Sequence, residues 1–190
     1  MQITPEQVKE LRDRTGISVM QCRRALAEAG GDLERAVDIL KQNSSEIAQK
    51  KLGREAKEGR VSIKTEGNKA VLVALHCETD FVAKNEDFAA LLQALLEKAL
   101  REGVAKMKSG AKELIDPVIQ RTGENIQLGA AYEVSGQTLG NYVHNGKIGV
   151  IVSLEGGSPE LARDIAMHLA ATEPEYHSEN EADLLRQPFI

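Results

Sequence analysis

Two stretches of this 190-residue chain repeat the same order of signals, and this repeat limits the possible folds more than any other feature. In the first, the apolar run over 69–75 follows a Gly67-Asn68 turn and precedes a helical pattern. In the second, residues 147–154 follow an Asn145-Gly146 turn in the same way. Such turns between apolar runs are typical of β-hairpins. We therefore predict two hairpin-plus-helix halves in an α+β fold, because each sheet needs a helix to cover it.

The first half contains further helix and strand signals. Residues 70–75 are apolar without alternation, which predicts a strand covered on both faces. From Phe88 apolar residues recur at helical spacing, and Asn85 can cap the helix that they form. A helix ending at Gly123 and a strand over 126–134 should follow.

The second half ends in another helix. Ser158 and Pro159 are typical of a helix start. Leu161, Ile165 and Leu169 follow at helical spacing, so we expect them to face inward. The remaining residues toward the C-terminus are acidic and weakly patterned.

The N-terminal region reads as three short helices within 43 residues. Thr4-Pro5-Glu6-Gln7 and the pair Ser18 and Gln21 each have the pattern of a capping box, and Asp32 can cap the third helix. Gly16 ends the first helix. Helices this short are not stable alone, so we expect them to pack together as a bundle.

Residues 44–60 carry several basic side chains and few apolar ones, which is typical of a solvated helix or linker. We therefore divide the chain into four parts. These are a helical bundle over 1–43, a charged helical linker over 44–60, a first core half over 61–125, and a second core half with its tail over 126–190.

A short polar turn with one aromatic ring, Thr79-Asp80-Phe81-Val82, joins the strand and helix of the first half. The second half makes the same connection through Glu155-Gly156-Gly157, so the turn is an addition to the repeat, and such asymmetry is typical of function. Because apolar side chains are more often buried than exposed, we expect Phe81 and Val82 to pack on the chain's own core. The alternative is an exposed ring that fits a partner's pocket.

The segment Cys77-x-Thr79-Asp80-Phe81-Val82-Ala83-Lys84-Asn85 closely resembles the signature of the bacterial elongation factor Ts family. The resemblance covers nearly the whole chain. It includes Leu11-Arg12-x-x-Thr15-Gly16, Met20-x-Cys22-Arg23-Arg24-Ala25-Leu26, Gly123-Glu124-Asn125-Ile126 and the hairpin with His144. It implies a ubiquitin-associated-type fold for the N-terminal bundle.

Members of that family are guanine nucleotide exchange factors for elongation factor Tu, and the resemblance implies the same activity here. It implies that residues 79–82, the exchange loop, bind the G domain of GDP-bound elongation factor Tu, with Asp80 and Phe81 inserted near its magnesium and nucleotide site. Thr79 and Val82 flank them in this loop. Further partner contacts are implied for Val19, Met20, Arg23, Lys51 and His144.

Exchange of this kind follows from linkage. A factor that binds the nucleotide-free partner more tightly than the GDP-bound one weakens GDP binding by the same ratio. No bond is made or broken by the chain, so we expect no enzyme and no cofactor.

Longer members of the family carry a coiled-coil hairpin in the second core half and a C-terminal helical module. Here Ala170-Ala171-Thr172-Glu173-Pro174-Glu175-Tyr176 runs within a few residues into Gln187-Pro188-Phe189, with neither segment present. We therefore expect a naturally short member or a trimmed chain.

Composition narrows the possible functions. The net charge is −5, and no basic stripe interleaved with aromatic residues is present, so we expect a protein partner and no direct nucleic acid contact. No segment has transmembrane length and none reads as a signal peptide, which predicts a cytoplasmic protein without membrane contact. The two cysteines, Cys22 and Cys77, form no zinc spacing with each other or with histidines, and we expect no metal site.

Two alternatives from other classes remain at this point. A binding adaptor would recognise helical surfaces through the bundle alone, although a scaffold does not need Asp80 and Phe81 at a strand end. An enzyme would use Cys77 with a histidine as nucleophile and base. The adjacent His76 is a poor partner, because neighbouring strand residues point to opposite faces.

Overall fold

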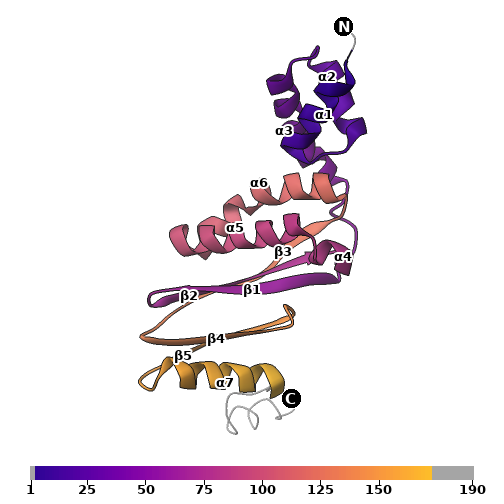
Figure 1. The fold of residues 1–190 in the computed structure, drawn as a ribbon. Coiled ribbons are helices and arrows are strands. Elements are labelled where there is room, and N and C mark those ends of the chain that lie inside the picture. The colour runs from indigo at the N-terminus through magenta and orange to yellow at the C-terminus, as the bar shows by residue number, and fades with distance from the viewer. Residues whose placement is uncertain (1–2, 173–190) are drawn as a thin grey trace, which may run out of the picture.

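The computed structural model of the protein describes residues 3–172. Its N-terminal part is a bundle of three helices, α1 (Pro5–Thr15), α2 (Val19–Glu28) and α3 (Leu33–Gln49), at one end of the molecule (Figure 1). The bundle has its own apolar core, in which the largest fully buried side chains are Leu11 and Leu26. The expected packing of three short helices is therefore confirmed.

The helices begin where the sequence predicts. Thr4 and Gln7 form a complete capping box at α1, in which the side chain of each residue accepts the backbone N–H of the other. Ser18 caps α2 by accepting the N–H of Gln21, and Asp32 caps α3. These caps satisfy N–H groups that have no partner within the helix.

Helix α3 does not end near residue 43 but continues to Gln49, into the segment expected to be a linker. Leu40, Ser44 and Ala48 form a buried stripe at helical spacing, and Ala48 belongs to the main core. The hydroxyl of Ser45 donates to a carboxylate oxygen of Asp116 on the neighbouring α6 (2.8 Å). The stripe was missed because Ser and Ala carry little hydrophobic signal, although small side chains allow close helix packing.

The central sheet has the antiparallel order β1-β2-β3. Its strands are β1 (Glu58–Glu66), β2 (Lys69–Cys77) and β3 (Ile126–Ser135). The predicted turn at 67–68 joins β1 to β2, and β3 pairs with the other side of β2. Thus β3 completes the sheet of the first hairpin, although it begins the part of the chain that we assigned to the second half.

Helices α5 (Glu86–Glu102) and α6 (Val104–Thr122) cover one face of this sheet (Figure 1). Their apolar side chains enclose Val71, Val73 and Leu75 of β2 in the main core. Asn85 caps α5, and Gly123 ends α6 with a φ of 77°. Both boundaries agree with the sequence prediction.

A second hairpin covers the other face of the central sheet. It consists of β4 (Thr138–His144) and β5 (Ile148–Leu154), and Gly149 of β5 lies against Leu72 and Val61. Helix α7 (Pro159–Thr172) packs on the outer side of this hairpin (Figure 1). The central strand is therefore covered on both faces, as its unbroken apolar run predicts.

The inward face of α7 differs from the prediction. Ala162, Ala166 and Ala170 are buried, whereas Leu161 is 49% exposed and Ile165 and Leu169 are only half-buried. A Cβ atom on Gly140 of β4 would lie 2.2 Å from the carbonyl carbon of Ala162. The helix lies so close to the strand that only its alanine stripe fits between them.

The architecture confirms the α+β class, with two antiparallel hairpins that are each covered by helices. From end to end the layers are the bundle, α5 with α6, the central sheet, the second hairpin and α7 (Figure 1). The acidic segment after Thr172 lies outside the described residues.

Candidate partner-binding site

The exchange loop forms the short helix α4 (Asp80–Ala83), which directly follows the end of β2. Thr79 is its N-cap, and the Thr79 hydroxyl accepts the backbone N–H of Val82 (3.3 Å). A helix of four residues is not stable by itself, so its geometry depends on this cap and on packing.

Phe81 projects from α4 into solvent, with 82% of its surface exposed. The two residues that follow it turn the other way: Val82 packs partly against the main core and Ala83 is buried. The interpretation that Phe81 folds back on the core is therefore wrong, while it holds in part for Val82. Burying Val82 and Ala83 on one side of so short a helix leaves Phe81 on the opposite side.

Asp80 lies beside the exposed ring and is paired with Lys84 (Oδ2 to Nζ, 2.7 Å). The hydrogen bond and the charge of Lys84, one helical turn away, lower the pKa of the Asp80 carboxyl. The exposed tip of the exchange loop thus carries an aromatic ring next to a carboxylate held in its ionised form.

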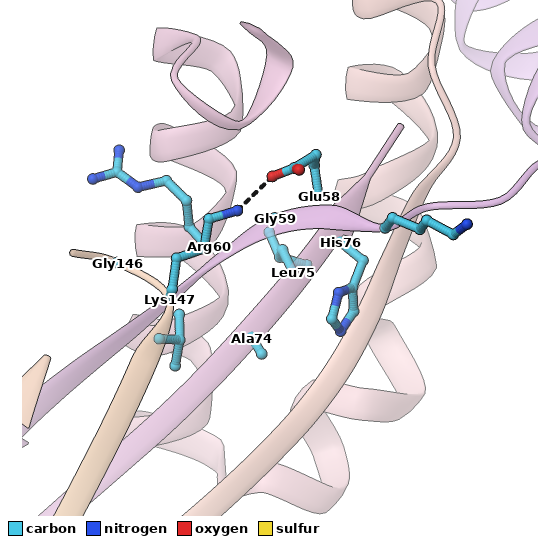
Figure 2. Close-up of a pocket in the computed structure, with 10 residues that line it drawn as sticks. Glu58, Gly59, Arg60, Ala74, Leu75, His76, Gly146 and Lys147 are labelled. Atoms are coloured by element: carbon cyan, nitrogen blue, oxygen red, sulfur yellow. Dashed lines mark hydrogen bonds and ion pairs between the residues drawn. The ribbon is translucent and has the colours of Figure 1, made fainter. Parts of the chain in front are cut away.

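The turn of the second hairpin lies at the same end of the central sheet as α4. Glu58, the first residue of β1, pairs with Cys77 at the end of β2, and its carboxylate binds Lys147 beyond the hairpin turn (2.5 Å). The backbone N–H of Val61 also donates to the carbonyl of Gly146 (2.8 Å). Figure 2 shows the Glu58–Lys147 contact at the edge of a pocket.

His144 is exposed at this turn. Its Nδ1 atom is hydrogen-bonded to the Tyr142 hydroxyl, and its Nε2 atom to the Asn145 amide, at 3.1 Å each. Asn145 has a φ of 51° and Gly146 a φ of 69°, and the N–H of Lys147 donates to the carbonyl of His144, as in a type I′ turn. The imidazole is thus held in place and remains accessible.

The bundle presents the other expected contact residues on its surface. Val19 is 46% exposed, Met20 is 74% exposed and Arg23 is also exposed. Val19 and Arg23 line a groove with Pro5 and Val8. In Figure 1 the bundle, α4 and the turn between β4 and β5 lie along the same side of the molecule.

Comparison with known families shows to which family the chain belongs. The sequence model of the family described as Elongation factor TS matches residues 78–185, which is more than half of the chain. The chain belongs to the elongation factor Ts family. The matched range begins one residue before the exchange loop and includes α4, both core helices and the second hairpin.

Proteins named elongation factor Ts are also similar over most of the chain. The protein from Pseudomonas savastanoi pv. phaseolicola is 41% identical over 178 residues, which cover 92% of this chain and 62% of the relative. That from Pseudomonas fluorescens is 43% identical over 182 residues, with the same coverage. That from Pseudomonas aeruginosa PAO1 is 40% identical over 185 residues, which cover 95% of this chain and 64% of the relative. The chain therefore spans less than two thirds of these elongation factor Ts relatives.

One of the residues expected to contact the partner makes a contact within the chain. The ammonium group of Lys51 donates to the carbonyl of Gly123 at the end of α6, where a cation is favourable. The structure thus brings Asp80, Phe81 and Val82 together in α4, with Thr79 as the cap of this helix. It places Val19, Met20 and Arg23 on the bundle and holds Lys51 against α6.

Sequence reasoning did not assign a role to Glu124, which the structure places against the exchange loop. One carboxylate oxygen of Glu124 accepts the Thr79 hydroxyl (2.6 Å), and the other accepts the Thr79 N–H (3.0 Å). The available signal was the Gly-Glu-Asn-Ile segment that resembles the elongation factor Ts family, but residues 45 apart in the sequence cannot be paired by periodicity.

Both thiols of this family member are buried, and Cys77 contributes to the main core. Burial, followed by the charges of Glu124 and Glu58, raises the pKa of the Cys77 thiol to about 11. A buried neutral thiol is a poor nucleophile, so the geometry does not support an enzyme that uses Cys77.

Over residues 3–172, no group of three or more His, Cys, Asp or Glu side chains is arranged to hold a metal ion. Within the same described residues, no helix combines the length and the apolar character needed to cross a bilayer.

Proposed function

We propose that the chain is a translation elongation factor Ts that promotes GDP release from elongation factor Tu. The observation that carries the proposal is the exposure of Phe81 at the tip of a capped helix whose neighbouring residues are buried. An aromatic ring that is 82% exposed offers a large apolar surface for burial in a partner's pocket, and aromatic residues are frequent hot spots of protein interfaces. Membership of the elongation factor Ts family supports elongation factor Tu as that partner.

The exchange loop inserts Asp80 and Phe81 near the magnesium and nucleotide site of the GDP-bound G domain. The carboxylate of Asp80 brings negative charge to a site that holds anionic phosphates and their cation, and the ring of Phe81 needs an apolar pocket. The added charge of Asp80 and the insertion of the Phe81 ring are both compatible with an opened nucleotide site. They are not compatible with a closed site that retains GDP and magnesium. Binding energy gained in the nucleotide-free complex therefore appears as weaker GDP binding.

The other contacts lie on either side of this loop. Val19, Met20 and Arg23 dock the bundle on the G domain, Lys51 contacts it near the connection to the core, and His144 forms a second contact from the hairpin turn. Their placement along one side of the molecule supports a continuous interface (Figure 1). The division into bundle, linker and two core halves belongs to the same proposal, as do a cytoplasmic location and the absence of nucleic acid, membrane and cofactor contacts.

The proposal is tested by the release of fluorescent GDP from bacterial elongation factor Tu in excess unlabelled GDP. Adding the chain at low concentration should accelerate release, because linkage requires it of a factor that favours the empty partner. Binding of the two proteins without acceleration would instead support an adaptor that docks through its bundle. If neither binding nor acceleration occurs, elongation factor Tu is not the partner.

A further inference from the structure

We propose that Glu124 is a positioning residue for the exchange loop: it fixes the cap of α4 and thereby the direction in which Phe81 projects. The functional part of this inference rests on the proposed function. Its structural part concerns the isolated chain and can be tested without a partner.

The first step of the argument is the geometry at Thr79. The two oxygens of the Glu124 carboxylate accept the N–H and the hydroxyl of Thr79, at 3.0 Å and 2.6 Å. A hydroxyl has one proton and two lone pairs, so donation to Glu124 leaves the lone pairs for the N–H of Val82 (3.3 Å). The carboxylate thus selects the hydroxyl orientation that caps α4, and charged acceptors make the stronger hydrogen bonds.

The second step is that Glu124 is itself held. It follows Gly123, which ends α6 in the left-handed conformation and donates its N–H to the carbonyl of Ile119 (2.8 Å). The Gly123 carbonyl accepts the ammonium of Lys51, and the Glu124 N–H contacts the Thr122 hydroxyl (3.4 Å). The carboxylate is therefore attached to a fixed helix end and not to a free loop.

A reciprocal contact joins the same two segments. The carboxylate of Glu78 accepts the backbone N–H of Asn125 (2.6 Å) and pairs with Arg54 (3.5 Å). The Asn125 side chain, which is fully buried, donates to the carbonyl of Arg54 (2.6 Å). Residues 78 and 79 are thus tied to 125 and 124 in both directions, and we call these four residues the clamp.

The third step connects the clamp to the ring. On one side of Phe81 the chain is fixed by the clamp at Thr79, and on the other by burial of Val82 and Ala83. Phe81 itself makes no comparable packing contact, being 82% exposed. Without Glu124 the hydroxyl of Thr79 can rotate, the cap of a four-residue helix weakens, and the ring samples more directions.

The test of the structural part uses the absence of tryptophan from the sequence. Phe81→Trp introduces a single reporter, and its fluorescence anisotropy decay measures the local motion of the side chain on the nanosecond scale. Glu124→Ala should increase the amplitude of this motion. Glu97→Ala is the matched control, since Glu97 pairs with Lys64 on the surface (3.0 Å) and should leave the decay unchanged.

Glu124→Gln is the second variant, because it keeps the size of the side chain and one acceptor oxygen. It should shift the decay in the same direction by a smaller amount, and it decides the question if Glu124→Ala does not fold. The inference would be overturned if Glu124→Ala gave the same anisotropy decay as the Glu97→Ala control. If Glu124→Ala does not fold, the same comparison is made with Glu124→Gln.

The functional part is tested by a double-mutant cycle in the GDP release assay. Glu124→Ala alone should reduce the acceleration about tenfold, in the range expected for losing a hydrogen bond to a charged group. In a Phe81→Ala background the same change should have little further effect, because Glu124 acts through the ring. Two losses that multiply would contradict the inference. If the wild-type chain accelerates nothing, the proposed function fails, and the anisotropy result still decides the positioning role.

Discussion

Two phenylalanines seven positions apart in the sequence have opposite environments. Phe88 is fully buried in the main core, whereas Phe81 is 82% exposed. Phe88 lies in the first turn of the long amphipathic helix α5, whose periodicity places it inward. Phe81 belongs to a helix of one turn, in which only the burial of Val82 and Ala83 decides which side faces out.

The first prediction at the residue scale concerns the carboxyl group of Asp80. Lys84→Met keeps an unbranched side chain that is one atom shorter and removes its charge, so the pKa of Asp80 should rise toward its ordinary value of 3.8. Carboxyl carbon shifts in an NMR pH titration measure this value. Lys108→Met on α6 is the control, and an Asp80 pKa that stays low in Lys84→Met would contradict the ion pair.

The sign of the Asp80 shift fixes the pH range in which it matters. Because folding lowers the pKa of Asp80, its ion pair stabilises the fold above the ordinary value of 3.8 and loses this contribution as the pH falls through the lower folded value. The charge of the exchange loop is therefore constant near neutral pH.

The second residue-scale prediction concerns the thiols. At pH 8 neither Cys22 nor Cys77 should react with a disulfide reagent in the folded chain, because both are buried and burial raises both pKa values. Unfolding in denaturant should release two reactive thiols per chain. A thiol that reacts within seconds in the native protein would contradict this placement.

The raised pKa of Cys77 also predicts a dependence of stability on pH. The neutral thiol stabilises the fold fully below its ordinary pKa of 9.0, and this contribution is lost as the pH rises through the folded value of about 11. Denaturant unfolding of Cys77→Ala should therefore lose less stability than the wild type between these two pH values. Equal losses would show that the thiol is not protected in this way.

At the scale of elements, the sequence predicts where helices start and end better than it predicts which of their faces are buried. Capping side chains and glycines act locally, so Thr4, Asn85 and Gly123 mark boundaries that the structure confirms. Buried faces made of small residues carry no comparable signal, which explains why α3 was predicted too short and why Leu161 was expected inside α7. In both cases close approach to a neighbouring element selects Ala or Ser over Leu.

The close packing of α7 on β4 predicts the effect of adding a single methyl group at Gly140. Its Cβ would meet the backbone of Ala162 and Arg163 at 2.2 and 2.3 Å, and backbone atoms cannot move aside without shifting the whole helix. Gly140→Ala should lower the free energy of unfolding by about 1–3 kcal/mol or more, as overpacking does. Denaturant unfolding measures the change.

Gly53→Ala is the control for this prediction, since no atom lies within 4 Å of its added Cβ. If Gly140→Ala were as stable as Gly53→Ala, α7 would not lie against β4 as closely as described.

At the scale of the whole molecule, the repeat predicted the two hairpins but not the way in which they combine. The third strand of the central sheet, β3, follows α6 in the sequence yet pairs with β2 of the first hairpin. Long-range pairing of this kind depends on which strand edge of the sheet is free after the hairpin forms. The local sequence pattern does not predict this pairing. The contacts of Glu124 and Asn125 with the exchange loop arise from the same long-range arrangement.

Because of the layered arrangement, the three proposed contact regions (the bundle, α4 and the turn between β4 and β5) lie on the same side of the molecule (Figure 1). The bundle is joined to the core by α3, which packs on α6, and by a hydrogen bond from Gln120 to Gln21 (3.1 Å). Val19 and Met20 on the bundle are thus held relative to α4 and the turn with His144. We expect the partner to contact the bundle and the turn with His144, while the exchange loop binds it between these two regions.

The most direct test of the account compares two exposed aromatic residues in the GDP release assay. Phe81→Ala should reduce the acceleration about 30-fold or more, as expected for an interface hot spot. Tyr132→Ala removes a ring that is 62% exposed on β3, outside the proposed contacts, and should leave release unchanged. Thermal melts of both variants should match the wild type closely, because neither ring is buried. Full acceleration by Phe81→Ala, or an equal loss in Tyr132→Ala, would contradict the central claim that the exchange loop acts through Phe81.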